Sequence, residues 1–296
     1  VWGSAEPGMK EYKTAEFYES FFKEKGFKVS SGLADMPTAF IAEWGSGKPV
    51  VGFLGEFDAL PTLSQEAACP EKKPIVPGAY GQGCGHNSLG AGAAGAAMAF
   101  RDYLEENHLS GTVRFYGCPG EEYGSGKVFM ARAGLYDDLD VCLTWHPGDM
   151  NKVSTTSSLA NISVMFSFNG VSAHAAANPY LGRSALDAVE LMNVGVNYLR
   201  EHIIPEARVH YAYVDAGGIA PNVVHDHATI HYFIRAPKMT QAQAIFERVK
   251  DVAWGAAMMT GTTYTVNLKE AIFDYNPTRT LEKVMQKAFE AVGAPK

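Results

Sequence analysis

The stretch "PVVGFLGEFDAL", residues 49–60, decides the fold, because an unbroken apolar run in it leads directly into acidic residues. A short continuous apolar run is typical of a strand that is buried on both faces of a parallel sheet. The preceding segment, residues 14–27, has the pattern of an amphipathic helix with Phe17, Phe21 and Phe22 on one face. This alternation of helix and buried strand predicts an α/β fold with a mostly parallel sheet.

Two further apolar strands are predicted, in residues 111–120 and residues 139–147, with a helix over residues 127–133 between them. From residue 154 onward the predicted order changes to strand, helix, strand, strand, helix, strand, which is the order of a ferredoxin-like α+β unit. We therefore predict a catalytic domain with an inserted lid or dimerisation domain. The catalytic domain comprises residues 1–153 and 271–296, and the inserted domain comprises residues 154–270.

The composition excludes several classes of partner. The chain has 296 residues and a formal net charge of −7, without a basic run that could bind nucleic acid or an acidic membrane. No apolar run approaches the ~20 residues that a membrane-spanning helix requires. Four scattered cysteines are too few for a disulfide framework, so we expect reduced thiols and a cytoplasmic protein that acts on a small molecule.

Side chains that bind metals follow the predicted strands. Ligands of open α/β sheets gather beyond the carboxyl ends of the strands, so residues after different strands are expected to meet there. The residues are Glu56 and Asp58 after the first run, Cys84 and His86 in the next loop, Glu121 and Glu122 after the second, and His146 after the third.

Each of these residues has a simpler explanation when it is taken alone. A C-x-H pair is often incidental, adjacent glutamates usually form a solvated turn, and His146 could be a core histidine. Their coincidence at one sheet edge favours a metal site.

Thiolate, imidazole and carboxylate ligands together suit zinc, with manganese or cobalt as alternatives. One glutamate of the pair would face the metals while the other takes a proton from a water molecule, as metal-assisted hydrolysis requires.

A dinucleotide site is the competing interpretation of the same region. Gly90, Gly92 and Gly95 have the spacing GxGxxG. A dinucleotide-binding loop must follow directly on a strand, whereas these glycines lie within a predicted small-residue helix that runs to Glu106. Close packing of that helix on the sheet explains the small residues.

The motifs "GEFDALP", "GCGHNSLG", "CPGEEYGSGK", "TWHP" and "GGIAPNVV" resemble those of the metal-dependent amidohydrolases of the aminoacylase and carboxypeptidase superfamily. The resemblance extends over the whole chain. It implies two divalent metal ions, manganese or zinc, and hydrolysis of an amide between an aryl or acyl group and an amino acid. The substrate expected from the most similar branch is p-aminobenzoyl-glutamate. The expected partner is an identical chain or a related A subunit.

The resemblance also implies a role for individual residues. Glu121 would be the general base, Asp58 would orient a metal ligand, and Cys84 would replace the bridging carboxylate of relatives. Glu56 stands where relatives outside this branch have a metal-binding histidine. The implied metal ligands are Cys84, His86, Glu122 and His146. The implied residues of the inserted domain are His174, which would stabilise the oxyanion in the other subunit, and Asn222 and Arg235, which would hold the substrate.

Two residues of the inserted domain, and the function of the chain itself, also have alternative explanations. Taken without the resemblance, His174 is as well explained as a loop histidine without function, and Arg235 as a surface ion pair.

The family also takes a final metal-binding histidine from a C-terminal segment, and no histidine follows His231 here. We therefore expect the chain as given to lack one ligand, and a non-catalytic partner subunit is one alternative. A general N-acyl-amino-acid deacylase is the other.

Overall fold

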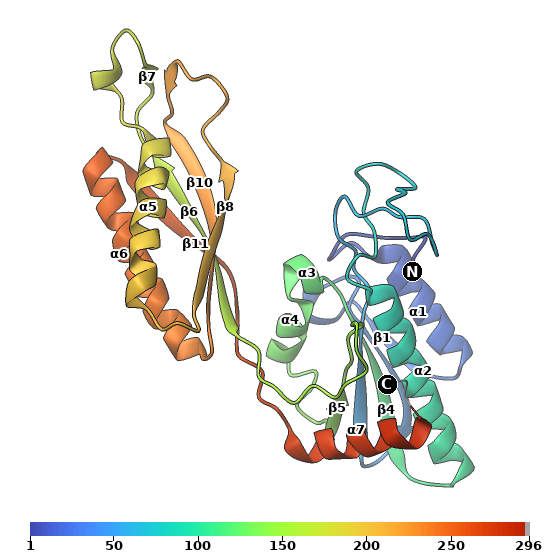
Figure 1. The fold of residues 1–296 in the computed structure, drawn as a ribbon. Coiled ribbons are helices and arrows are strands. Elements are labelled where there is room, and N and C mark those ends of the chain that lie inside the picture. Colours follow the sequence, from blue (N-terminus) through green and yellow to red (C-terminus); the bar gives the residue numbers. More distant parts are fainter. Residues whose placement is uncertain (294–296) are drawn as a thin grey trace. The chain divides into compact units, whose positions relative to one another are not determined.

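The computed structural model describes residues 1–293, which form two compact units, residues 1–150 and residues 151–293 (Figure 1). Among the described residues, none of the helices combines the length and apolar character that crossing a bilayer requires. Each unit has its own sheet and its own core.

The first unit contains a five-stranded sheet with the order β1-β2-β4-β3-β5. Strand β2 is antiparallel to both β1 and β4, whereas β3 is parallel to β4 and β5. Four of the five strands therefore run in one direction, which confirms the predicted α/β fold with a mostly parallel sheet. The strands are β1 (Lys28–Ser31), β2 (Phe40–Ser46), β3 (Val50–Glu56), β4 (Gly111–Cys118) and β5 (Val141–Leu143).

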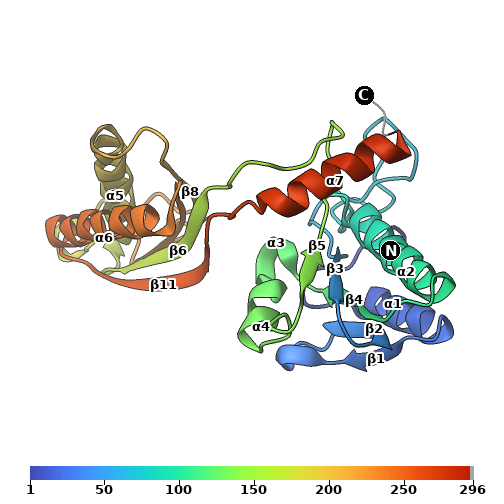
Figure 2. The same cartoon turned by 90° about the horizontal axis from the view of Figure 1, so that it is seen from below.

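Helices cover both faces of this sheet, as Figure 2 shows. Strand β4 divides its side chains between the faces: Val113 and Phe115 pack with the residues of α1 and α2, while Tyr116 and Cys118 pack with Met130 of α4. The helices of this unit are α1 (Tyr12–Glu24), η1 (Leu33–Asp35), α2 (His86–Glu106), α3 (Glu121–Gly124) and α4 (Gly126–Arg132).

Helix α1 buries a different stripe from the one predicted. Tyr18 and Phe22 are buried, one helical turn apart, together with Ala15. Phe17 is 58% exposed and contacts only the edge of the stripe, with its ring 5.6 Å from that of Tyr18. The assignment of Phe17 to the buried face is wrong, because residues at 15, 18 and 22 follow the helical repeat and residue 17 lies beside it.

The second unit contains a four-stranded antiparallel sheet with the order β11-β6-β10-β8. Its core includes residues of α5 and α6, which lie on one face of the sheet (Figure 1). The order of its main elements is the predicted one. They are β6 (Ala160–Asn169), α5 (Ala185–Leu199), β8 (Arg208–Asp215), β10 (His227–Ala236), α6 (Met239–Thr260) and β11 (Thr263–Ile272).

Smaller elements of the second unit were not predicted. A short ribbon pairs β7 (Ala173–His174) with β9 (Val223–Val224), and 3-10 turns form at η2 (Pro179–Leu181) and η3 (Arg200–His202). Helix α7 (Arg279–Val292) begins with Arg279 donating to the carbonyl of Thr155, within the same unit. The assignment of residues 271–296 to the catalytic domain stays a prediction.

Candidate metal centre

The candidate metal-binding side chains of the first unit come from the ends of its strands and from the start of helix α2. Glu56 is the last residue of β3 and pairs in register with Cys118, the last residue of β4. Glu121 begins α3 after β4, His146 follows β5, and His86 begins α2. Because parallel strands end at one edge of the sheet, these four segments meet there.

His86 lies at the centre of this cluster and is fully buried. Its Nδ1 is 2.9 Å from Asp58 Oδ1, and its Nε2 is 3.1 Å from Glu56 Oε2. The same Nε2 lies 3.8 Å from a carboxylate oxygen of Glu121 and 4.0 Å from one of Glu122. A carboxylate can only accept, so His86 Nδ1–H donates to Asp58 and fixes the orientation of the ring.

A thiol and a second imidazole adjoin His86. Cys84 Sγ lies 3.3 Å from His146 Nε2, and the rings of His86 and His146 are nearly perpendicular with centroids 5.8 Å apart. His146 Nδ1 is 2.9 Å from the carbonyl oxygen of Pro147, which can only accept. The Nδ1–H of His146 therefore donates to the Pro147 carbonyl oxygen, and Nε2 faces the Cys84 thiol.

Local packing holds these segments against each other. The indole N–H of Trp145 donates to the carbonyl oxygen of Leu89 at 3.1 Å, which attaches the segment after β5 to helix α2. A Cβ added at Gly92 would lie 2.8 Å from the Trp145 ring. Gly85 has a φ of +80°, a left-handed conformation that favours glycine, and immediately precedes His86. These small residues bring His146 and His86 together.

Asp58 and Lys127 connect the remaining acids. Asp58 Oδ2 accepts the N–H of Glu122 at 2.9 Å, so one carboxylate holds both His86 and the glutamate segment. The ammonium group of Lys127 pairs with the Glu56 carboxylate, which is itself only 9% exposed. Lys127 has no distinguishing sequence signal beyond its place in "GSGK", and sequence reasoning did not find it.

The acids around the centre shift the pKa values of its ligands. Burial lowers the pKa of His86. The hydrogen bond and charge of Asp58, together with the charges of Glu56 and Glu121, raise it by more, so the net shift is upward. Burial and the Glu122 carboxylate raise the pKa of the Cys84 thiol to about 12. Burial and the charge of Glu56 raise the pKa of Glu121. Each shift has the same origin, an excess of negative charge in a partly dry site.

Three buried polar atoms of the cluster have no hydrogen-bond partner: Glu56 Oε2, His86 Nε2 and Glu122 Oε1. Buried polar atoms without partners are rare and require an explanation. With its Nδ1 proton donated to Asp58, a neutral His86 directs a lone pair from Nε2 at the Glu56 carboxylate, and two acceptors repel unless a cation lies between them. The donor set therefore fits a divalent metal, for which imidazole, thiolate and carboxylate are ordinary ligands.

Two sets of ligand atoms lie close enough to share an ion, each within 4.8 Å of one another. One is Cys84 with His86 and His146, and the other is Glu56 with His86 and Glu121. Glu122, the carboxylate that the resemblance assigns to the metals, is in neither set. Both Glu56 and Glu122 have one buried carboxylate oxygen without a hydrogen-bond partner, and the other oxygen of Glu56 pairs with Lys127.

The predicted residues of the second unit fall in two places. His174 and Asn222 lie side by side at the β7–β9 ribbon, where the Ala175 N–H donates to the Asn222 carbonyl. The Nδ1 of His174 accepts two backbone N–H groups at 3.1 and 3.2 Å, which leaves the proton on Nε2. Arg235 lies on β10 over the ring of Phe233, and its Nε is buried without a partner.

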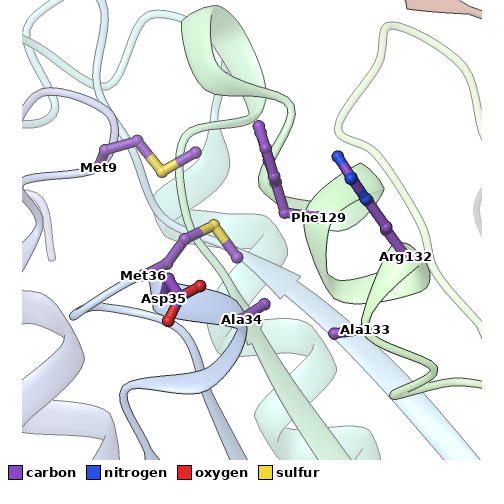
Figure 3. A pocket seen from close by; sticks show the side chains of 7 residues that line it. All are labelled: Met9, Ala34, Asp35, Met36, Phe129, Arg132 and Ala133. Atoms are coloured by element: carbon purple, nitrogen blue, oxygen red, sulfur yellow. The ribbon is translucent and has the colours of Figure 1, made fainter.

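A cavity of about 610 Å³ in the first unit is lined by residues other than those of the candidate metal centre (Figure 3). It contains one carboxylate, Asp35, and one guanidinium, Arg132, but no histidine or cysteine, so it does not supply the ligands of a metal site. Met, Phe and Ala side chains form the rest of its wall. They are Met9, Ala34, Met36, Phe129 and Ala133.

Residues 52–295 match the model of the peptidase family M20/M25/M40. This chain belongs to that family. An M20 relative, the B subunit of the p-aminobenzoyl-glutamate hydrolase of Escherichia coli (strain K12), is 50% identical over 295 residues, which are 100% of this chain and 61% of the relative. The Xaa-Arg dipeptidase of Mus musculus is 31% identical over 95% of this chain and 64% of its own length. The chain thus spans about three fifths of these M20 relatives.

A solved structure of an M20 protein has the same fold. The dinuclear metal-binding M20 peptidase of Bacillus subtilis superposes with a TM-score of 0.67 over 98% of this chain and 77% of its own chain, at 20% identity. The likeness at this identity concerns the fold alone.

Proposed function

We propose that the full-length protein hydrolyses p-aminobenzoyl-glutamate to p-aminobenzoate and glutamate. The observation that carries this proposal is the convergence of thiol, imidazole and carboxylate groups around His86, with three buried atoms that lack partners. The 50% identity with a protein named for that hydrolysis, over the whole of this chain, supports the choice of substrate.

Two divalent metal ions, manganese or zinc, would be held by four side chains of the first unit. Thiolate and imidazole favour zinc, and the surrounding carboxylates also suit manganese. Once bound, such ions polarise the scissile carbonyl and make a water molecule a stronger acid. The ligands are Cys84, His86, Glu122 and His146.

Glu121 is the general base in this proposal. It removes a proton from the attacking water and delivers it to the nitrogen of the leaving amine. Its side chain is 44% exposed, so the carboxylate reaches substrate and solvent, while one of its oxygens lies 3.8 Å from Nε2 of buried His86. Burial and Glu56 raise its pKa, which makes it a better proton acceptor than an ordinary carboxylate. Asp58 keeps His86 oriented.

Residues of the second unit would recognise the substrate. With its Nδ1 occupied by two backbone N–H groups, His174 offers Nε2–H to the developing oxyanion in the other subunit. Asn222 lies next to His174 on the ribbon and holds the substrate amide. The guanidinium of Arg235 forks onto a substrate carboxylate, which supplies the partner that its Nε lacks.

The partner in this proposal is a second identical chain or a related A subunit, and the compartment is the cytoplasm. The support is the name of the 50% identical relative, which calls it the B subunit of its enzyme and so implies at least one other kind of subunit. Co-expression with an A subunit, followed by a measurement of particle mass, distinguishes a mixed complex from a homodimer.

The proposal is tested with the full-length protein, alone and with an A subunit. Release of p-aminobenzoate from p-aminobenzoyl-glutamate is expected in the presence of manganese or zinc and should stop on chelation. Glu121→Gln should lower turnover at least about a thousandfold at unchanged metal content, because the proton acceptor is lost. Undiminished turnover by that variant would refute the assigned role.

A general N-acyl-amino-acid deacylase is a second candidate, since a dipeptidase is 31% identical over most of this chain. Acetylated, indole-conjugated and aminobenzoyl amino acids are compared in one assay. A preference for the aminobenzoyl compound supports the first candidate, and equal rates support the second. A non-catalytic subunit would bind metal weakly or not at all and would turn over none of them.

A further inference from the structure

The N-terminal segment Glu6–Glu11 packs against both loops that carry the acids of the centre. Its backbone forms a parallel bridge at Pro7 with Ala59, and the Ala59 N–H donates to the Glu6 carbonyl at 2.9 Å. A Cβ added at Gly8 would lie 3.0 Å from Gly120 Cα and 3.4 Å from Asp58 Oδ2. A Cβ there would have to displace the Gly120 backbone slightly, so the segment lies directly against the loops after β3 and β4.

Glu11 ends this segment and is fully buried. Its Oε1 accepts the N–H of Gly120 at 2.7 Å, and its Oε2 accepts the hydroxyl of Thr38 at 2.9 Å. Burial raises the pKa of the Glu11 carboxyl overall, and the hydrogen bonds from Gly120 and Thr38 act against this rise. Burying an acid is unfavourable unless hydrogen bonds compensate it, and one of the two bonds that do so here reaches the residue adjacent to the proposed base.

Gly120 immediately precedes Glu121 and has a φ of +59°, in the left-handed region. Met9 contacts the same turn, since a Cβ added at Gly120 would lie 3.0 Å from its methyl carbon. On the other side of Glu121, the N–H of Glu122 donates to Asp58 at 2.9 Å. Glu121 is therefore flanked by two backbone amides, each held by a buried carboxylate from a different segment.

We propose that Glu11 is a positioning residue for Glu121: it holds the Gly120 amide and so fixes the direction in which the Glu121 carboxylate points. This inference rests on the proposed function, in which Glu121 is the base. Glu11 does not touch the substrate or the metal ligands. It acts through backbone geometry, and a displacement of about 1 Å in a reacting group can reduce turnover about a hundredfold.

Four variants of the full-length protein separate positioning from general stability. Glu11→Ala removes both hydrogen bonds. Glu11→Gln is the conservative rescue, because its amide oxygen can still accept from Gly120 while its NH2 faces the Thr38 hydroxyl. Thr38→Val removes only the other bond. Glu6→Ala is the matched control, since the Glu6 carboxylate bonds the N–H groups of Lys13 and Thr14 at 3.0 Å and belongs to the same segment.

All variants are compared at a temperature where thermal unfolding shows each to be folded. Glu11→Ala should lower kcat about 10- to 100-fold with KM and metal content within about twofold of the wild type. Deuterium uptake at residues 119–124 should become faster, because the Gly120 amide loses its acceptor. Glu11→Gln should recover most of kcat and of the protection. Glu6→Ala and Thr38→Val should retain kcat within about twofold.

If Glu11→Ala does not fold, Glu11→Asp makes the same test, because it keeps the charge and withdraws the carboxylate by one methylene group. A kcat within twofold of the wild type for Glu11→Ala, or for Glu11→Asp in its place, overturns the inference, as does an equal loss in Glu6→Ala. Failure of the proposed function is recognised separately, by full turnover in Glu121→Gln. In that case unchanged deuterium uptake in Glu11→Ala still overturns the positioning role.

Discussion

His86 Nδ1 lies 2.9 Å from Asp58 Oδ1, and this hydrogen bond is the central constraint of the candidate centre. It determines that the other ring nitrogen of His86 faces the remaining acids. Burial raises the pKa of Asp58, but the hydrogen bonds from His86 and from the Glu122 N–H lower it by more. The net shift of the Asp58 pKa is therefore downward. The carboxylate therefore stays ionised and holds two segments that are distant in sequence.

Replacement of Asp58 by Ala should weaken metal binding about 10- to 100-fold, because His86 loses the acceptor that fixes its tautomer and orientation. The dissociation constant is measured by competition with a chromophoric chelator. Asp35→Asn is the control, because Asp35 is exposed and lies away from the ligands in the cavity wall. Equal affinities for the Asp58 variant and the wild type would exclude this role of the carboxylate.

Metal affinity should rise with pH. Without an ion, the pKa of the Cys84 thiol is raised to about 12, so the thiol holds a proton that a bound metal must displace. The apparent dissociation constant is expected to fall about tenfold per pH unit for each proton displaced, measured between about pH 6 and 8. Cys84→Ala should lose the contribution of the thiol, whereas Cys69→Ala should not. An affinity that is independent of pH would contradict this account.

Two glycines of helix α2 should respond oppositely to alanine. A Cβ at Gly90 would lie 2.6 Å from the Tyr18 hydroxyl and 2.7 Å from the Glu56 carbonyl oxygen, whereas nothing lies within 4 Å of one at Gly95. Gly90→Ala should destabilise the protein by about 1–3 kcal/mol through overpacking. Gly95→Ala should stabilise it by up to about 1 kcal/mol. Urea unfolding measures both. A Gly90→Ala variant that is as stable as the wild type or more stable would show that Gly90 is not needed for helix-to-sheet contact.

The strands and the helix that contains these glycines could be predicted from sequence because their signals are local. An apolar run, a turn and a periodic helix are each visible within a dozen residues. The GxGxxG spacing was interpreted correctly for the same reason, since α2 begins at His86 and encloses Gly90 to Gly95. The buried stripe of α1 was misplaced, because four aromatic residues at positions 17, 18, 21 and 22 compete for one face and only packing decides between Phe17 and Tyr18.

The supporting residues of the centre could not be predicted, because their signals are not local. Glu11 and Gly120 are 109 positions apart, and Glu56 and Lys127 are 71 apart. Each pair consists of common residue types in ordinary contexts. The convergence of the candidate ligands could be predicted because the ends of parallel strands must meet, which is a rule of topology. The residues that hold those ligands obey no such rule and require coordinates.

Lys127→Met should reduce stability by about 3 kcal/mol, because it leaves the Glu56 carboxylate buried among other acids without its cation. The side chains of Lys127 and Glu56 are 27% and 9% exposed. Lys48→Met is the matched control: its ion pair with Asp140 is 74% and 35% exposed and should matter little. Chemical denaturation in the presence of a chelator measures both variants. A loss for Lys127→Met no larger than for Lys48→Met would show that the pair is not a structural requirement.

The central claim is that distant thiol, imidazole and carboxylate groups form one metal centre. Anomalous diffraction at a metal absorption edge, from crystals of the full-length protein grown with manganese or zinc, tests it most directly. The account predicts two peaks beside His86, with ligand distances of about 2.0–2.3 Å to atoms of Cys84, Glu122 and His146. Metal-loaded crystals with no anomalous peak among these side chains would contradict it.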